Sequence, residues 1–247
     1  MNRNKFIKIT SLTLAGATVL PQLSFAEGPQ SFARSQLIGK GNPEIVGESY
    51  TGKMHRDTKE ALKKMTAEAR REGIAIEVVS AYRSFDRQKQ IFERKYRQFT
   101  SEGLAPIETL EKIIEYSTIP GTSRHHWGTD LDLIDGNVAR PQNVLEAEHF
   151  HGTGVFCKFK AWMDANANRF GFYETYTDNG LRKGFAYEPW HFSYAPVSRP
   201  MLHAYRKLDL KQIILEEDIL GAQHFTDAFI ERYRAENILD INPELLS

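Results

Sequence analysis

Strand patterns are scattered irregularly among helical patterns along this chain of 247 residues, and that order limits the possible folds. Short apolar, β-branched runs predict strands, and apolar residues at helical spacing predict amphipathic helices. The predicted strands lie at 74–79, 131–134 and 190–194, and the predicted helices at 57–72, 85–99, 107–116, 155–170, 212–220 and 226–237, the last two on the surface. Because no βαβ unit repeats, we expect an α+β fold with a small, mostly antiparallel sheet flanked by helices.

Charge and cysteine content exclude several classes of protein. Lys+Arg and Asp+Glu both number 32, so the formal net charge is zero and gives no support to a nucleic-acid partner. The single cysteine, Cys157, cannot form an internal disulfide, and it excludes a multi-cysteine zinc finger or an iron–sulfur site. The eight histidines are therefore the soft ligands that remain for a transition metal.

Residues 1–26 have the three-part pattern of a secretory signal peptide, with a frayed N-terminal helix as the alternative. Basic residues precede an apolar run at 9–20, and the Ser-Phe-Ala triplet at 24–26 resembles a cleavage site. The run is shorter than the roughly 20 apolar residues of a membrane-spanning helix, and no later stretch of sequence is long enough to span. We expect an exported protein, periplasmic or extracellular, and the sequence leaves both the general secretory and the twin-arginine route open.

The first group of candidate functional residues lies at 123–132. Asp130 and Asp132 are two apart in a predicted strand, so both point to one face. His125 precedes Asp132 by seven positions, and Gly128 offers a bend that can bring the histidine back toward the aspartate. Taken alone, the segment also fits a polar loop that enters a strand with both aspartates facing solvent.

The second group is Glu188-Pro189-Trp190-His191. Proline cannot occupy a central strand, so Glu188 is expected in a turn that brings it close to His191. A lone histidine here would more often be a core residue bonded to a backbone carbonyl. The two groups together supply two histidines and a carboxylate, the three-ligand set of a catalytic zinc site with an open fourth position. A glutamate beside one ligand is a natural general base.

The motif Ser123-x-His125-x-x-Gly128-x-x-x-Asp132, followed about sixty residues later by Glu188-x-x-His191, resembles the VanY-type zinc D-alanyl-D-alanine carboxypeptidase family. This family shares its fold with lysostaphin-type peptidases and hedgehog domains. The resemblance implies one zinc ion per chain on the sheet, with His125, Asp132 and His191 as ligands and Glu188 as catalytic base. The family usually has a small residue where this chain has Asp130, which could compete with Asp132 for the metal.

A third group, Ser80-Ala81-Tyr82-Arg83-Ser84, follows a predicted strand and opens a helix. The family has a similar stretch whose arginine lies by the substrate, so the resemblance implies that role for Arg83. A planar guanidinium can grip a carboxylate or a developing oxyanion, although a surface salt bridge is the common alternative for an arginine. Ser123 and Gln90 are further candidates for substrate contact.

The resemblance implies peptidoglycan stem peptides as substrate and removal of a terminal D-alanine as reaction. An L,D-carboxypeptidase, a D,D-dipeptidase, a cell-wall endopeptidase, a non-catalytic zinc-binding module and a metal-free envelope protein are the alternatives. We expect a signal peptide at 1–26, an irregular lead-in at 27–52, a zinc peptidase domain at 53–196 and a helical C-terminal extension at 197–247. The sequence gives no oligomeric state, and it assigns no role in chemistry to His126, His149 or His151.

Overall fold

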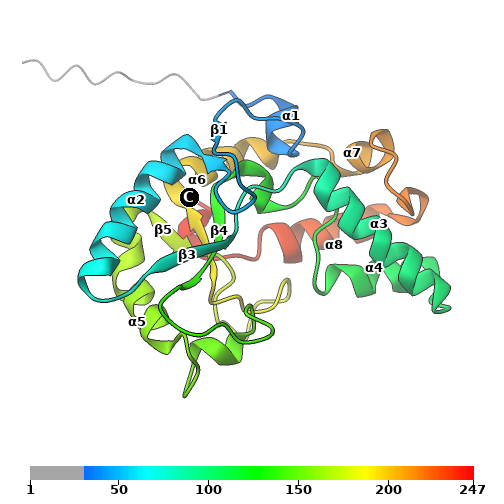
Figure 1. Ribbon diagram of the computed structural model, residues 1–247. Helices are drawn as coiled ribbons and strands as arrows, with labels where there is room; N and C mark the ends of the chain where they lie inside the picture. Colours follow the sequence, from blue (N-terminus) through cyan, green and yellow to red (C-terminus); the bar gives the residue numbers. More distant parts are fainter. Residues whose placement is uncertain (1–30) are drawn as a thin grey trace, which may run out of the picture. The chain divides into compact units, whose positions relative to one another are not determined.

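The structure, a computed structural model, describes residues 31–247 (Figure 1). The predicted signal peptide at 1–26 and the first residues of the predicted lead-in lie outside these described residues. Within them, the chain is an α+β protein whose sheets are small and antiparallel, which confirms the predicted fold class. None of the helices in this part is both long and apolar enough to cross a membrane.

Four strands form the main sheet in the order β3-β4-β6-β5, and each neighbouring pair is antiparallel. Their bounds are Ile76–Ser80 for β3, Asp130–Asp135 for β4, Phe172–Glu174 for β5 and His191–Tyr194 for β6. The three predicted strands correspond to β3, β4 and β6. Strand β5 has no counterpart in the sequence prediction, because three residues are too few to show a period.

The predicted lead-in at 27–52 contains regular structure within its described residues. Helix α1 covers Arg34–Leu37, and strand β1, Ile45–Val46, pairs with β2, Met54–His55, in a separate two-stranded sheet. Such short elements leave no periodic signal in a sequence, and the other described residues of this segment form turns and irregular chain.

The described residues also form seven longer helices. They are α2 (Arg56–Arg71), α3 (Phe85–Ser101), α4 (Pro106–Ile114), α5 (Cys157–Asn166), α6 (Ala195–Tyr205), α7 (Leu210–Glu216) and α8 (Asp227–Tyr233). The predicted helix at 155–170 is α5 followed by a 3₁₀ turn, Ala167–Phe170, which ends at Gly171 with φ +82°. Helix α6 has no counterpart in the sequence prediction, since Pro196 and Pro200 mask its helical pattern.

The main sheet has one apolar face and one polar face. Leu131, Leu133 and Phe192 pack with residues of α2 and α5 in one hydrophobic cluster, and these helices lie together on one side of the sheet in Figure 1. Side chains alternate along a strand, so Asp132 and His191 project from the opposite face. The register sets Asp132 directly across from His191, and Asp130 across from Ser193. The sheet therefore brings the two predicted motifs together on its polar face.

A second hydrophobic cluster joins α3 and α4 to the C-terminal helices α6, α7 and α8. Ile213 and Ile214 of α7, and Phe229 and Ile230 of α8, are all buried. The opposite faces of both helices are exposed, so α7 and α8 are surface helices whose apolar sides pack against partners that are distant in the sequence. The proposed division at 196/197 stays a prediction, although 197–247 shares this core with the predicted peptidase domain.

The C-terminal segment also holds the loop that leads into the first motif. The Tyr205 hydroxyl donates a hydrogen bond to the carbonyl of Gly121 over 2.7 Å, and the Tyr233 hydroxyl accepts one from the backbone N–H of Ile119 over 3.2 Å. Tyr233 also lies 2.8 Å from the hydroxyl of Thr122. The loop at 119–122 therefore reaches the site along a path fixed by residues from the end of the chain.

Candidate active site

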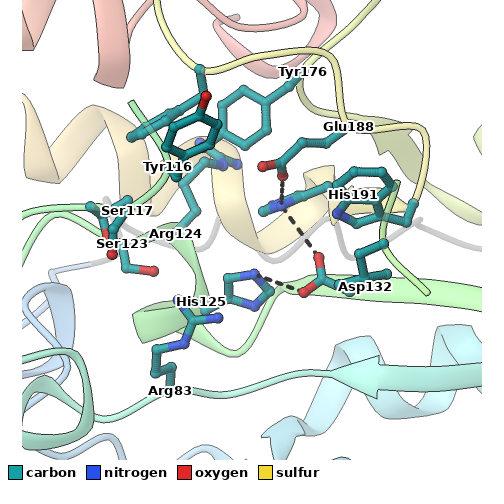
Figure 2. Close-up of a pocket in the computed structure, with 14 residues that line it drawn as sticks. Arg83, Tyr116, Ser117, Ser123, Arg124, His125, Asp132, Tyr176, Glu188 and His191 are labelled. Atoms are coloured by element: carbon teal, nitrogen blue, oxygen red, sulfur yellow. Dashed lines mark hydrogen bonds and ion pairs between the residues drawn. The ribbon is translucent and has the colours of Figure 1, made fainter. Parts of the chain in front are cut away.

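A pocket of about 240 Å³ opens on the polar face of the sheet (Figure 2). Polar and charged side chains from all three sequence motifs gather in it, and aromatic side chains form part of its wall. The lining residues are Arg83, Tyr116, Ser117, Thr118, Ser123, Arg124, His125, Asp132, Leu145, Tyr176, Phe185, Glu188, Trp190 and His191. Of the predicted site residues, Gln90 alone is missing from this lining.

His125, Asp132 and His191 form a compact cluster in the pocket. His125 Nε2 lies 3.6 Å from Asp132 Oδ2, and His191 Nδ1 lies 3.5 Å from Asp132 Oδ1. One ligand atom from each of the three residues lies within 4.8 Å of the others, and all three residues are buried. Two imidazole nitrogens and a carboxylate at this spacing could hold one metal ion.

Gly128 makes this cluster possible from a short stretch of chain. A 3₁₀ turn, Arg124–Trp127, carries His125, and Gly128 ends the turn with φ +70° before β4 begins. In this left-handed conformation the chain reverses, so that His125 returns to Asp132. The carbonyl of Gly128 also accepts a hydrogen bond from the backbone N–H of His55 over 2.8 Å, which fixes the turn.

Replacing Gly128 with alanine is expected to destabilise the protein strongly. A Cβ there would lie 2.4 Å from Ile45 Cδ1 and 2.7 Å from the backbone nitrogen of His55. The left-handed conformation alone costs a residue with a Cβ roughly 1–2 kcal/mol, and the clash adds to this. Thermal unfolding measures the loss, and Gly103→Ala is the control. Gly103 also has a left-handed φ, of +97°, but a Cβ added there would have nothing within 4 Å in the described chain. Equal losses of stability would show that the close approach at Gly128 is unimportant.

Hydrogen bonds to the outer nitrogens orient both histidines. The Nδ1 atom of His125 lies 2.8 Å from the carbonyl of Ala81, which can only accept, so Nδ1 carries the proton and Nε2 offers its lone pair to the cluster. His191 is turned the other way: Nε2 lies 3.1 Å from Asp130 Oδ1, and Nδ1 faces Asp132 and Glu188.

The electrostatics of the cluster favour a bound cation. Burial raises the pKa of the Asp132 carboxyl to about 6. Burial lowers the pKa of His191, but its hydrogen bonds to Asp130 and Glu188 outweigh this effect and raise it to about 10. Asp132 Oδ1 is buried and has no hydrogen-bond partner among the described residues. A cation between these groups would satisfy the unpartnered oxygen and take the place of the proton that His191 otherwise holds beside the carboxylates.

Glu188 stands beside the cluster at the pocket wall, as Figure 2 shows. Its Oε2 atom lies 3.0 Å from His191 Nδ1, while its side chain stays 29 % exposed. The residue occupies a turn in which the N–H of His191 donates to the carbonyl of Glu188 over 3.0 Å. This is the turn that Pro189 predicts, and it leaves the carboxylate open to the pocket.

Arg83 reaches the pocket beside His125 (Figure 2). Its Nη1 donates to Gln88 Oε1 over 3.0 Å, whereas its Nε is buried without a partner in the described chain. Its backbone is fixed on both sides, because its N–H donates to the His125 carbonyl and its own carbonyl lies 2.6 Å from His126 Nδ1. Arg83 therefore offers an unpaired N–H from a rigid backbone.

His126 is a structural residue in this loop. Its ring is buried, with Nδ1 directed at the Arg83 carbonyl and Nε2 accepting from the backbone N–H of Gly121 over 3.1 Å. Burial lowers its pKa to about 4, so the ring is neutral at pH 7. It links the Arg83 loop to the loop before the first motif. The sequence analysis likewise assigns His126 no role in chemistry.

Gln90 is not placed where its predicted role requires. It lies exposed on α3, outside the pocket, whereas Gln88 is fully buried and holds Arg83 in place. Two residues along a helix are about 200° apart, so only one of this pair can face the site. The prediction that Gln90 contacts the substrate is therefore not supported by its position. Ser123, the other candidate for substrate contact, does line the pocket.

Asp130 and Arg124 form a buried ion pair that the sequence prediction does not contain. Arg124 Nε lies 2.7 Å from Asp130 Oδ1, and both side chains are at most 5 % exposed. Burial acts to raise the pKa of Asp130, but Arg124 and His191 hold it well below its usual range. Asp130 contacts the nitrogen of His191 that points away from Asp132, and it is not part of the cluster of candidate ligands that Asp132 forms with the two histidines.

A second group of potential ligands, Glu146, Glu148 and His149, lies outside the pocket. Its residues are exposed or half-buried, and the nitrogen Nε2 of His149 lies 3.0 Å from the carbonyl of Asn143. Exposed acidic groups of this kind are common without a metal, so no site is assigned to it.

Fold and site together define an α+β protein with a candidate mononuclear metal site of two histidines and one aspartate in a surface pocket. The chain belongs to the VanY family, described as D-alanyl-D-alanine carboxypeptidase, whose model matches residues 51–197. The resemblance seen in the sequence motifs is thereby confirmed.

Individual relatives are similar over part of their length. A D-alanyl-D-alanine carboxypeptidase of Enterococcus faecalis (strain ATCC 700802 / V583) is 28% identical over 130 residues, which are 52% of this chain and 43% of the relative. The putative carboxypeptidase YodJ of Bacillus subtilis (strain 168) is 31% identical over 143 residues, or 57% and 46% of the two chains. This chain thus matches less than half the length of either curated relative. The solved structure of VanYB in complex with D-alanine-D-alanine is 23% identical, with a TM-score of 0.49 over 71% of this chain and 90% of that one.

Proposed function

We propose that this protein is a zinc metallopeptidase that removes the terminal D-alanine from peptidoglycan stem peptides, with one zinc ion per chain. The observation that carries this proposal is the convergence of His125, Asp132 and His191 in one pocket beside Glu188 and Arg83. Zinc accepts nitrogen and oxygen ligands, and catalytic zinc sites have three protein ligands with one position open. Membership of the VanY family and similarity to a D-alanyl-D-alanine carboxypeptidase support the reaction and its substrate.

The residues around the cluster have complementary roles in this reaction. Bound zinc supplies Lewis acidity, which makes water a nucleophile at neutral pH and polarises a carbonyl group. Glu188, beside the cluster and open to the pocket, accepts a proton from the attacking water and returns it to the amine of the leaving D-alanine. Arg83 donates N–H groups to the oxygen on which negative charge develops or to the free carboxylate of the substrate.

Arg83 leads us to expect a preference for substrates with a free C-terminal carboxylate. A guanidinium binds two carboxylate oxygens at once, which a lysine cannot do. Losing a charge-assisted hydrogen bond costs about 1.5–3 kcal/mol, or roughly 10–150-fold in kcat/KM. The measurement compares one D-Ala-D-Ala peptide as free acid and as C-terminal amide, with Arg83→Lys and Arg83→Ala. We expect slow cleavage of the amide, a loss with Arg83→Lys and a larger loss with Arg83→Ala.

The kinetic pattern separates the two roles of Arg83. A rise in KM alone indicates anchoring of the ground state, whereas equal falls in kcat and kcat/KM indicate stabilisation of the transition state. Equal rates on acid and amide, with Arg83→Ala active on both, would remove Arg83 from the site and favour an endopeptidase.

Digestion of defined stem peptides tests the proposed reaction against its relatives. The zinc-loaded protein is expected to remove one alanine from a pentapeptide stem that ends in D-Ala-D-Ala, and to leave the resulting tetrapeptide intact. Cleavage of the tetrapeptide would indicate an L,D-carboxypeptidase, hydrolysis of free D-Ala-D-Ala a dipeptidase, and cleavage of cross-linked stems an endopeptidase. Zinc binding without any product would indicate a non-catalytic module.

Export to the periplasm or the cell exterior belongs to the same proposal. Peptidoglycan stem peptides in the wall lie outside the cytoplasmic membrane, so the enzyme must reach them there. The signal-peptide pattern at 1–26 supports such a route.

A further inference from the structure

The Asp130 carboxylate lies fully buried behind the candidate ligand His191. It accepts hydrogen bonds from Arg124 Nε at 2.7 Å, from the Thr129 hydroxyl at 2.7 Å and from the Ser193 hydroxyl at 2.9 Å. Its Oδ1 atom also lies 3.1 Å from His191 Nε2. The carboxylate is thus clamped by donors from the turn Arg124–Trp127, from Thr129 just before β4 and from β6, and it presents an oxygen to one imidazole nitrogen.

Stability alone does not explain this arrangement. Taking two charges out of water is costly, and replacing a buried ion pair with apolar residues of similar volume is often neutral or stabilising. Here further contacts fix the position of Arg124. Its Nη2 is 2.8 Å from the Ser193 hydroxyl, and its guanidinium lies over the Trp127 ring, 4.9 Å from the centroid. These contacts hold the Asp130 carboxylate in a fixed position beside His191.

That acceptor decides which nitrogen of His191 faces the pocket. An ionised carboxylate accepts hydrogen bonds only, so the nitrogen next to Asp130 must carry a proton. The other nitrogen, Nδ1, is directed toward Asp132 and the ligand cluster and lies 3.0 Å from Glu188 Oε2, so the proton on Nδ1 is the one that a bound metal would displace. The Tyr176 ring, edge-on to His191 at 4.9 Å, restricts the imidazole from another side.

We propose that Asp130, clamped by Arg124, is a positioning residue that fixes the tautomer and orientation of His191 so that its Nδ1 can bind the metal. This inference rests on the proposed zinc site, and it assigns the Arg124–Asp130 pair a task in metal affinity rather than in substrate binding. Outer partners of metal-binding histidines typically contribute about 10–100-fold to metal affinity or activity.

The test uses two variants of the full chain. Asp130→Asn keeps the shape of the side chain and removes its charge. The double variant Arg124→Met with Asp130→Ala removes both charges together, so no buried charge is left unpaired. The control variant Lys160→Met with Glu174→Gln removes another largely buried pair, with N–O 3.0 Å, whose Glu174 lies opposite Phe192 on the other face of the sheet.

Zinc affinity is measured by competition with a chromogenic chelator, and the visible spectrum of the cobalt-substituted protein reports the ligand geometry. We expect the zinc dissociation constant to rise about 10–100-fold in the double variant and less in Asp130→Asn, with a changed cobalt spectrum. The melting temperature of the metal-free protein shows whether each variant folds. In peptide assays kcat should fall while KM stays unchanged, and the control pair should keep the wild-type zinc affinity.

Two outcomes would overturn the inference. One is a folded double variant with wild-type zinc affinity and cobalt spectrum. The other is a rise in KM at unchanged zinc affinity, which would place Arg124 in contact with the substrate. Failure of the proposed function would be a separate result. It would show as a wild-type protein that binds no zinc, or as a His125→Ala variant that binds zinc as tightly as the wild type.

Discussion

Replacing Glu188 with alanine is expected to abolish turnover and to leave zinc binding intact. Glu188 lies beside the cluster but is not one of the three candidate ligands, so its removal should take away the proposed proton acceptor alone. General acid–base catalysis is typically worth about 10²–10⁴-fold, and kcat should fall by at least this factor. Glu188→Gln should be nearly as inactive, since an amide of the same shape cannot take a proton. Steady-state kinetics and elemental analysis of the same preparation give both quantities.

The control for this loss is a glutamate outside the pocket. Glu146 belongs to the exposed acidic group away from the site, and Glu146→Ala should keep both zinc content and kcat. Near-normal turnover in Glu188→Ala would show that another residue accepts the proton. Loss of zinc in Glu188→Ala would instead show that Glu188 binds the metal.

Replacing His125 with alanine is expected to remove both metal and activity. Only Asp132 and His191 would remain, and two ligands cannot hold zinc at the concentrations that three ligands allow. A metal that binds the folded state at 1,000 times its dissociation constant stabilises it by about 4 kcal/mol. Zinc should therefore raise the melting temperature of the wild-type protein and leave that of His125→Ala unchanged.

A histidine away from the pocket provides the matched control. His149→Ala should respond to zinc as the wild type does, because His149 belongs to the exposed group near Glu146. A zinc-dependent rise in melting temperature in His125→Ala, equal to that of the wild type, would place the metal elsewhere.

The fold class and the main strands could be predicted from the sequence because they depend on local patterns. The apolar runs that become β3, β4 and β6 have the right length and composition, and Gly171 ends its helical segment as glycine often does. The partners of the apolar faces of α7 and α8 could not be predicted, because they lie in α3 and α4, far earlier in the chain.

The grouping of candidate site residues could be predicted for a different reason. His125 and Asp132, and Glu188 and His191, are local pairs whose geometry follows from Gly128 and Pro189. Gln90 lies outside the pocket, because the face of α3 that meets the Arg83 loop carries Gln88, and the sequence alone does not show which face this is.

The Arg124–Asp130 pair left no recognisable signal in the sequence. Its residues are six apart, one in a 3₁₀ turn and the other in a strand, so they follow neither the helical nor the strand period. The polar-loop alternative placed Asp130 in solvent, whereas β6 covers this part of β4 and buries the carboxylate completely.

Titration of the metal-free protein with zinc, while the release of D-alanine from a pentapeptide stem is followed, tests the central claim most directly. Activity should be absent without metal, rise linearly with added zinc and level off at one equivalent per chain. Wherever D-alanine is released, the product peptide should be lighter than the substrate by one alanine residue. Release of D-alanine by metal-free protein, or one equivalent of bound zinc without any release, would contradict a zinc carboxypeptidase built on His125, Asp132 and His191.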